Sequence, residues 1–287
     1  RFFTGFFLAG IYPVGMKIAA DYYEKGLGKS LGYLVGALVV GTAFPHLLKE
    51  VTHTLSWNTV LVSTSGLAVL GGSLMIALVP NGPYRKRSQQ LQLSAFVQVF
   101  QNRNFRSAAF GYFGHMWELY TFWAFVPIML QTYVLAHPNT HFPIPLLSFV
   151  IIAVGGLACV LGGYLSQVAG TKRVASIALF ISGVCCLISP LLFMQGSATL
   201  FIAFLLFWGM VVIADSPLFS TLVAKNASAE IKGTALTIVN CIGFAITIVS
   251  IQLVNELRIW TDSNMVYMVL SIGPILGLIA LASKKRG

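Results

Sequence analysis

The sequence predicts an all-α protein that crosses a membrane several times, and three observations carry this prediction. Hydrophobic residues make up 57% of the 287-residue chain and charged residues only 9%, with a mean hydropathy of +0.83. A soluble domain carries about 25% charged residues. The apolar residues form long runs, and the basic residues lie in the gaps between those runs. Lipid is therefore expected to be the solvent for most of the surface.

Nine hydrophobic segments are long enough to span the hydrocarbon core of a bilayer, which requires about 20 residues each. Helices are expected because every backbone group must be satisfied inside lipid and the segments are too long and too uniformly apolar for barrel strands. Pro127 lies in the long fourth segment, which is expected to be tilted or broken there. The segments are 2–22, 31–49, 57–79, 107–134, 146–168, 173–194, 198–223, 233–254 and 264–283.

The basic residues predict the orientation of these segments. If the loop at 23–30 is cytoplasmic, fourteen Lys and Arg residues fall on the cytoplasmic side and two on the opposite side. The C-terminus is then cytoplasmic, and the inner or plasma membrane of a cell is the expected location. A net charge of +10 does not indicate nucleic-acid binding here, because the charges form no single patch or stripe. Lys17 is expected to extend to the membrane interface.

A weak internal repeat relates the two ends of the chain. Pro13 matches Pro217 at an offset of about 204 residues, and Leu31 matches Leu236 after a one-residue insertion. Six segments separate the two copies, and repeats of this kind are typical of transporters built from two similar halves. Six helices per half predicts twelve in all, so three more helices are expected before residue 1.

The most specific motif is GGYLSQVAGTKR at 162–173, in a short loop between the fifth and sixth segments. The glycine pair allows close helix contact, the third glycine permits a tight turn, and the basic pair holds the loop in the cytoplasm. An ordinary basic turn is the alternative interpretation. The residues that carry the motif are Gly162, Gly163, Gln167, Gly170, Lys172 and Arg173.

This motif resembles the loop signature G-G-x-L-[SA]-D-x-x-G-[RK]-[RK]-[RK] of the major facilitator superfamily. Gln167 stands where that signature has Asp, which puts a charge-relay role at this position in question, although Gln can still cap a helix end. RFFTGFFLAG at 1–10 resembles the R-x-x-x-G-x-x-x-[GA] pattern of the fourth helix of the same superfamily. The two resemblances place the first segment as the fourth of twelve helices.

The resemblance implies a fold of two six-helix bundles, of which nine helices are present. Residues 1–79 would be the remainder of the first bundle, 80–106 a cytoplasmic linker with a short amphipathic helix at SAFVQVFQNRNF, and 107–287 the complete second bundle. It also implies a monomeric secondary transporter that moves a small solute by alternating access. The partners it implies are the bilayer and a coupled proton or co-substrate, as in a symporter. No cofactor is implied.

Ionisable residues inside membrane segments are candidate functional groups, because burying them in lipid is costly. Glu118 and His115 are three residues apart, so they are expected to share one face of the fourth segment. Together they could take up and release a proton, and Trp117, Tyr120 and Trp123 could enclose an organic solute. Pairing of Glu118 with a basic residue, and anchoring of the aromatic residues at the membrane interface, are the structural alternatives.

Three further polar residues of the membrane segments are candidates, and three glycines predict a packing contact. Asp215 precedes Ser216-Pro217, which predicts a helix kink or a cation contact. Arg1 would face the bundle and pair with an acid or an anionic solute. Asn240 could contact solute or form an interhelical hydrogen bond. Glycines in the second segment predict close helix packing; they are Gly32, Gly36 and Gly41.

Other function classes are less well supported by the sequence. An intramembrane enzyme would need a catalytic pair or a metal set such as His-Glu-x-x-His, and the sequence has none. The four cysteines lie in apolar runs, so they are expected to be small buried residues and not disulfide or metal ligands. A sensor or scaffold on the same fold, without transport activity, stays open as the alternative function.

Overall fold

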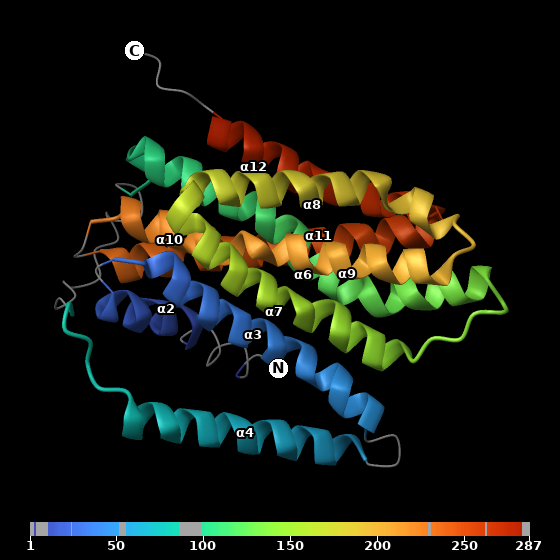
Figure 1. Ribbon diagram of the computed structural model, residues 1–287, viewed down its shortest axis with the longest axis horizontal. Coiled ribbons are helices and arrows are strands. Elements are labelled where there is room, and N and C mark those ends of the chain that lie inside the picture. Colours follow the sequence, from blue (N-terminus) through green and yellow to red (C-terminus); the bar gives the residue numbers. More distant parts are fainter. Residues whose placement is uncertain are drawn as a thin grey trace.

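The computed structural model describes residues 3, 11–23, 25–51, 56–85, 99–228, 231–261 and 263–282 (Figure 1). Within these residues the regular elements are all helices, and eight helical stretches are long and apolar enough to cross a membrane. The all-α membrane fold is thereby confirmed. The first expected segment, 2–22, is described only at Phe3 and from Ile11 onward, and the motif at 1–10 with Arg1 lies almost wholly outside the described residues.

The helices follow the expected segments closely; α3 and α6 each begin four residues before theirs, and α11 ends seven residues beyond its own. The polar residues at segment ends stay helical because helical hydrogen bonding satisfies the backbone up to the membrane surface. The elements are α2 (Ile11–Tyr22), α3 (Leu27–Val51), α4 (Trp57–Leu78), α6 (Arg103–Ala136), α7 (Ile144–Ala169), α8 (Thr171–Phe193), α9 (Ala198–Ala214), α10 (Ser216–Asn226), α11 (Lys232–Thr261), a 3₁₀ helix η1 (Asn264–Ser271) and α12 (Ile272–Ala282).

Helix α6 differs from the expectation at its start and at its middle. It begins at Arg103, inside the stretch predicted as linker, because the side chain of Asn102 accepts hydrogen bonds from the backbone N–H groups of Asn104 (2.9 Å) and Phe105 (3.2 Å) and caps the helix. It then runs unbroken through Pro127 for 34 residues. Of the predicted amphipathic helix, 94–98 lie outside the described residues and 99–101 are helical.

Two further expectations from the sequence concern Lys17 and the cysteines. Lys17 forms an ion pair with Asp21, one turn along α2, and its side chain is 30% exposed. Cys241 is exposed, whereas the other three cysteines are buried as expected. The exposed thiol is tolerated because the outer surface of a membrane helix faces lipid, which accepts a small apolar residue.

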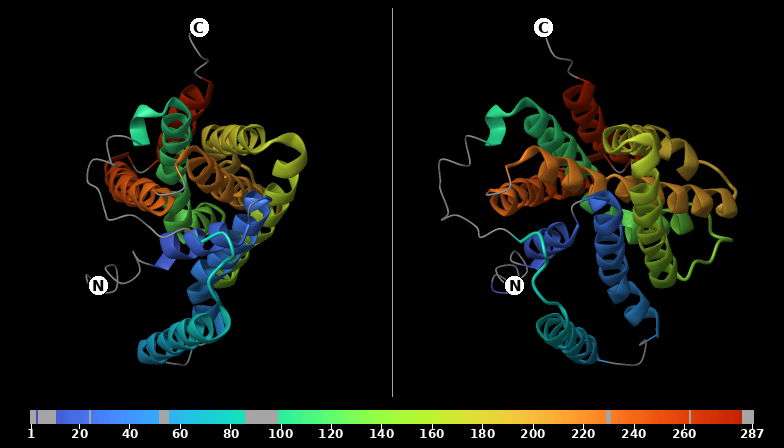
Figure 2. Two further views of the ribbon diagram at one scale, coloured as in Figure 1. Left: turned by 90° about the vertical axis from the view of Figure 1, so that its left-hand side faces the viewer. Right: turned by 60° about the vertical axis from the view of Figure 1, so that its left-hand side comes forward.

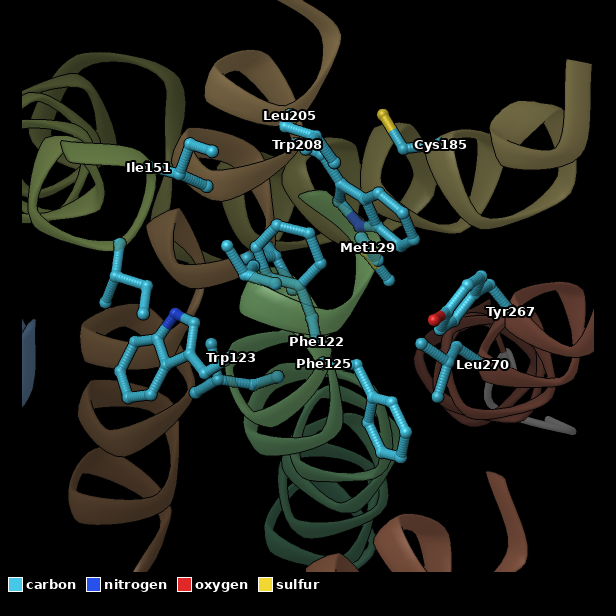
Figure 3. Close-up of a cluster of buried hydrophobic side chains, with 14 of the residues drawn as sticks. Phe122, Trp123, Phe125, Met129, Ile151, Cys185, Leu205, Trp208, Tyr267 and Leu270 are labelled. Atoms are coloured by element: carbon cyan, nitrogen blue, oxygen red, sulfur yellow. The ribbon is translucent and has the colours of Figure 1, made fainter. Parts of the chain in front are cut away.

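The helices from α6 to α12 pack into one bundle, and α3 lies along α7 at its side (Figure 1). Helix α4 stands apart from the other helices in every view (Figure 2), and none of its most apolar stretch is buried. A helix that is apolar all round and exposed all round is stable only in lipid. Two buried apolar clusters form the core, one of them around Phe122, Trp208 and Tyr267 (Figure 3).

Helices α3 and α7 approach each other through glycine. A Cβ added to Gly36 would lie 2.8 Å from the carbonyl oxygen of Gly156, and one added to Gly156 would lie 2.9 Å from the carbonyl oxygen of Gly36. Two turns away, a Cβ on Gly163 would lie 2.8 Å from the carbonyl oxygen of Gly28. The backbones are therefore in direct contact, as small residues permit in membranes. Gly41, expected to share this role, has open space around it.

The two copies of the internal repeat pack across each other. The first copy comprises α2 and α3, and the second comprises α10 and α11; α2 contacts α11, while α10 contacts α3. Pro13 lies in α2 and its repeat counterpart Pro217 lies in α10. This reciprocal packing is the arrangement that two similar units related by an axis produce.

Replacing Gly36 by leucine should disrupt the contact between α3 and α7, because the new side chain would meet the backbone of Gly156. We expect a loss of stability of about 1–3 kcal/mol or failure to fold, the usual effect of overpacking. Thermal unfolding in detergent, followed by circular dichroism, measures this. Gly66→Leu on α4 is the matched control, because nothing lies within 4 Å of that site. Equal unfolding temperatures for the two variants would contradict the role of the glycine contact.

Candidate functional site

Two ionisable residues of α6 point into the interior of the helix bundle. His115 and Glu118 are each only 1% exposed, and they lie about one turn apart on the face of α6 that meets α8, α9 and α10. The expectation that they share one face is confirmed. Because α6 passes through the middle of the bundle, its inward residues are removed from both water and lipid (Figure 1).

The carboxyl group of Glu118 is held by two neutral donors from two other helices. The hydroxyl of Ser182 on α8 donates to Oε2 at 2.9 Å, and the indole Nε1 of Trp208 on α9 donates to Oε1 at 2.7 Å. Trp208 in turn packs on Phe122, with ring centroids 4.6 Å apart (Figure 3). Within the described residues, no Lys or Arg is among these partners, and Glu118 is held by neutral donors in place of a basic partner.

His115 lies against Asp215, where the helix predicted at 198–223 breaks in two. Helix α9 ends at Ala214 and α10 begins at Ser216, with Pro217 in its first turn, where a missing N–H is tolerated. Nδ1 of His115 is 2.7 Å from Oδ1 of Asp215, and both side chains are buried. The contact is within ion-pair distance but lacks the alignment of a hydrogen bond.

The His115–Asp215 pair leaves polar atoms unsatisfied. Within the described residues, Nε2 of His115 and Oδ2 of Asp215 have no hydrogen-bond partner. An orphaned polar atom away from water costs about 1–3 kcal/mol, so such atoms are rare in native structures. An imidazole in contact with a carboxyl group inside a membrane bundle is a type of pair that typically marks a proton pathway.

The three aromatic residues predicted around Glu118 lie elsewhere. Nε1 of Trp117 donates to the carbonyl oxygen of Val269 in η1 at 3.2 Å. The ring of Tyr120 contacts Trp123 and Phe244, with centroids 5.1 and 5.4 Å away. Trp123 lies apart from Trp208 in the core cluster (Figure 3). Residues 117, 120 and 123 fall on other faces of α6 because helix geometry turns each residue by about 100°.

Asn240 links α11 to α6. The hydroxyl of Tyr112 donates to its Oδ1 at 2.6 Å, and its Nδ2 donates to the carbonyl oxygen of Leu236 at 2.8 Å. Interhelical hydrogen bonding, one of the two expectations for this residue, is therefore present. The ring centroids of Tyr112 and His115 are 5.9 Å apart. The hydrogen bond between Tyr112 and Asn240 is therefore the part of the polar cluster that lies nearest the Arg103 end of α6.

The loop motif has the local geometry that its residues predicted. Gly170 has φ +89° and joins α7 to α8 without an intervening loop. Gly163 contacts the backbone of α3, and a Cβ on Gly162 would lie 2.9 Å from the carbonyl oxygen of Ala214. Gln167 lines a small cavity beside the start of α3, together with Lys29 and Tyr33. Lys172 and Arg173 are exposed in the first turn of α8.

Ser182, Trp208 and Tyr112 complete the cluster and were not predicted from the sequence. Each is a neutral residue in an apolar segment, where serine, tryptophan and tyrosine occur for many reasons. The i, i+3 spacing of His115 and Glu118 identified their shared face, but it carries no information about which residues on other helices meet that face.

Comparison with known proteins identifies the type of chain. Residues 1–251 match the sequence model of the Major Facilitator Superfamily. The match extends from the first residue through most of α11 and so includes every residue of the polar cluster described above. No curated protein sequence matches the chain.

Replacing Trp208 by phenylalanine should leave one carboxyl oxygen of Glu118 without a donor in the bundle interior. We expect a loss of about 1–3 kcal/mol of stability, the typical penalty for an unsatisfied buried polar group. Thermal unfolding followed by circular dichroism measures the loss.

The matched control is Trp123→Phe. It removes the same indole group from a buried site, but Nε1 of Trp123 has no hydrogen-bond partner among the described residues. The control variant should therefore unfold at a clearly higher temperature than Trp208→Phe. Indistinguishable unfolding of the two variants would show that the bond to Glu118 does not stabilise the bundle.

Proposed function

The chain belongs to the major facilitator superfamily, and on that basis we propose that this membrane transporter moves a small solute by alternating access with a proton as the coupled ion. The first half would comprise the helices up to α4, and the second half α6 to α12. The reciprocal packing of α2 with α11 and of α10 with α3 supports this division. The glycine contact between α3 and α7 supports it as well, because smooth backbone surfaces allow two bundles to rock against each other.

The observation that carries the coupling proposal is the cluster of two carboxyl groups and an imidazole buried in the second half. Acids and histidines inside membrane bundles are rare and typically mark proton or substrate pathways. Within the part of the chain that the structure describes, Glu118 has only neutral donors and no basic residue pairs with it. A carboxyl group in such a site is suited to take up a proton when water reaches it and to release the proton when its partners rearrange.

The break at Asp215 supports a link between protonation and movement. Asp215 touches His115 on α6, and α10, which begins directly after it, packs against α3, α6 and α11. A change in the charge of the His115–Asp215 pair would alter the attraction that ties this break to α6. Because α10 contacts α3, a shift of α10 would displace α3, which belongs to the other proposed half.

Solute contacts are proposed on the surface of α6 and α11 that lies toward α2. Tyr120 is half-buried and sits beside Phe244 of α11, the helix that α2 contacts. Asn240 lies on the same helix, and Trp123 has an unpartnered indole N–H. These residues combine aromatic surface with hydrogen-bonding groups, which suits a small organic solute. Trp117, which is tied to η1, and Arg1, which lies outside the described residues, have no such support.

Replacing Glu118 by glutamine should abolish proton-coupled accumulation of solute while leaving expression unchanged. Glutamine keeps an acceptor oxygen for Trp208 or Ser182 but cannot exchange a proton at neutral pH. The protein is reconstituted in liposomes, and uptake of a solute identified by thermal-shift screening is measured with and without an imposed pH gradient.

Glu256→Gln is the matched control, because Glu256 is an exposed acid on α11. This variant should accumulate solute as the wild type does. Gradient-driven accumulation at the wild-type level by Glu118→Gln would refute the role of Glu118, and binding of the solute in the thermal-shift assay separates loss of coupling from loss of binding.

A further inference from the structure

Two apolar grooves run along α8 from the end of the helix that carries Lys172 and Arg173. The first has a volume of about 610 Å³ and lies between α8 and α12, lined by the two basic residues with Ser176, Phe180 and Leu278. Its mouth is cationic and its floor is apolar. Phe180 lies seven residues beyond Arg173, which places it about 10 Å deeper along the helix.

The second groove lies on the other side of the same helix. It has a volume of about 650 Å³ and is lined almost entirely by apolar side chains of α7, α8 and α9, among them Leu161, Leu165 and Ile181. Ile177 lines both grooves and so forms the ridge between them. The two grooves therefore begin near one basic pair and continue as separate apolar channels.

The basic pair is free to bind a ligand. Lys172 and Arg173 are exposed, and neither forms a salt bridge with the part of the chain that the structure describes. Neither groove is lined by an acidic residue. The basic pair lines the first groove, and the second groove begins beside it at Val174, the residue after Arg173. Both charges stand in the first turn of α8, at the end of the helix that the charge distribution predicts to be cytoplasmic.

We propose that these grooves bind one anionic diacyl phospholipid of the cytoplasmic leaflet, astride α8. The phosphate would lie on Lys172 and Arg173, and the two acyl chains would lie in the two grooves on either side of Ile177. Arginine and lysine attract phosphate, and the cytoplasmic leaflet supplies anionic headgroups at this depth. A zwitterionic lipid fits less well, because its own ammonium group would be repelled by the second basic residue.

The chemistry of the grooves argues for a lipid and against a small soluble anion. Free phosphate would use the basic pair but would leave both apolar channels unfilled. A phospholipid satisfies the charge and covers the exposed side chains of Ile177 and Phe180 in one binding event. A diacyl phospholipid has two acyl chains on one headgroup, and this number matches the two grooves that lie beside the basic pair.

Native mass spectrometry of the purified protein, titrated with dioleoyl-phosphatidylglycerol or dioleoyl-phosphatidylcholine, tests the proposal. We expect the first phosphatidylglycerol to bind about tenfold more tightly than the first phosphatidylcholine, as two basic residues near a headgroup allow. The double variant Lys172→Gln/Arg173→Gln should remove this preference, and Arg173→Gln alone should reduce it. Both variants change exposed residues, and circular dichroism verifies their folding.

Lys225→Gln/Lys232→Gln is the matched control, because it removes two basic residues from another loop on the same predicted side. It should keep the preference for phosphatidylglycerol. Equal binding of the two lipids, a preference that survives in Lys172→Gln/Arg173→Gln, or a preference lost equally in the control would each overturn the proposal. Displacement of phosphatidylglycerol by excess inorganic phosphate would also overturn it, since the site would then belong to a soluble anion.

A second measurement locates the acyl chain. Phe180→Trp places a fluorophore in the groove between α8 and α12, and the unmodified chain gives the background from its own tryptophans. Phosphatidylglycerol with brominated chains should quench the added fluorescence more strongly than brominated phosphatidylcholine at equal content in nanodiscs. Equal quenching by the two lipids would place the bound phospholipid elsewhere and refute the groove as its site.

Discussion

The direct backbone contact between α3 and α7 is the constraint on which the rest of the arrangement depends. Gly36 and Gly156 leave room for each other's carbonyl oxygen and for nothing larger. With α3 fixed on α7, α10 can pack against α3 and α2 can pack against α11. Lipid provides no hydrophobic force between apolar helices, so close packing of this kind is what orders them. Helix α4 has no such contact along its apolar length and stands alone (Figure 2).

Inside the bundle, several polar residues of α6 form hydrogen bonds with residues of other helices. Ser182 and Trp208 satisfy Glu118, and Tyr112 bonds with Asn240. The His115–Asp215 pair differs from these groups, because it brings an acid and an imidazole together at a helix break with polar atoms unsatisfied among the described residues. A bundle built for stability alone would replace such a pair with apolar residues at little loss. Its presence at the one break between α9 and α10 therefore favours a role in transport.

Helix α8 connects the lipid-facing surface with this polar interior. Lys172 and Arg173 stand at its start, Phe180 faces the first groove, and Ser182 donates to Glu118 from the opposite face. A phospholipid bound astride α8 would restrain the same helix that holds one of the two donors to Glu118. The proposed lipid site and the proposed coupling site would then share a single rigid element, through which lipid composition could influence transport.

The sequence by itself determined the class of fold, because in a bilayer hydropathy and segment length leave the helix as the only structure for each span. It also determined the shared face of His115 and Glu118, the tight turn at Gly170 and the helix break before Pro217, which depend on local geometry alone. Only the tertiary structure decided that Ser182 and Trp208 meet Glu118, that Asp215 lies against His115, and that Trp117 donates to Val269. Those contacts depend on how helices rotate and pack against one another, and neutral residues in apolar segments carry no periodic signal that reports such packing.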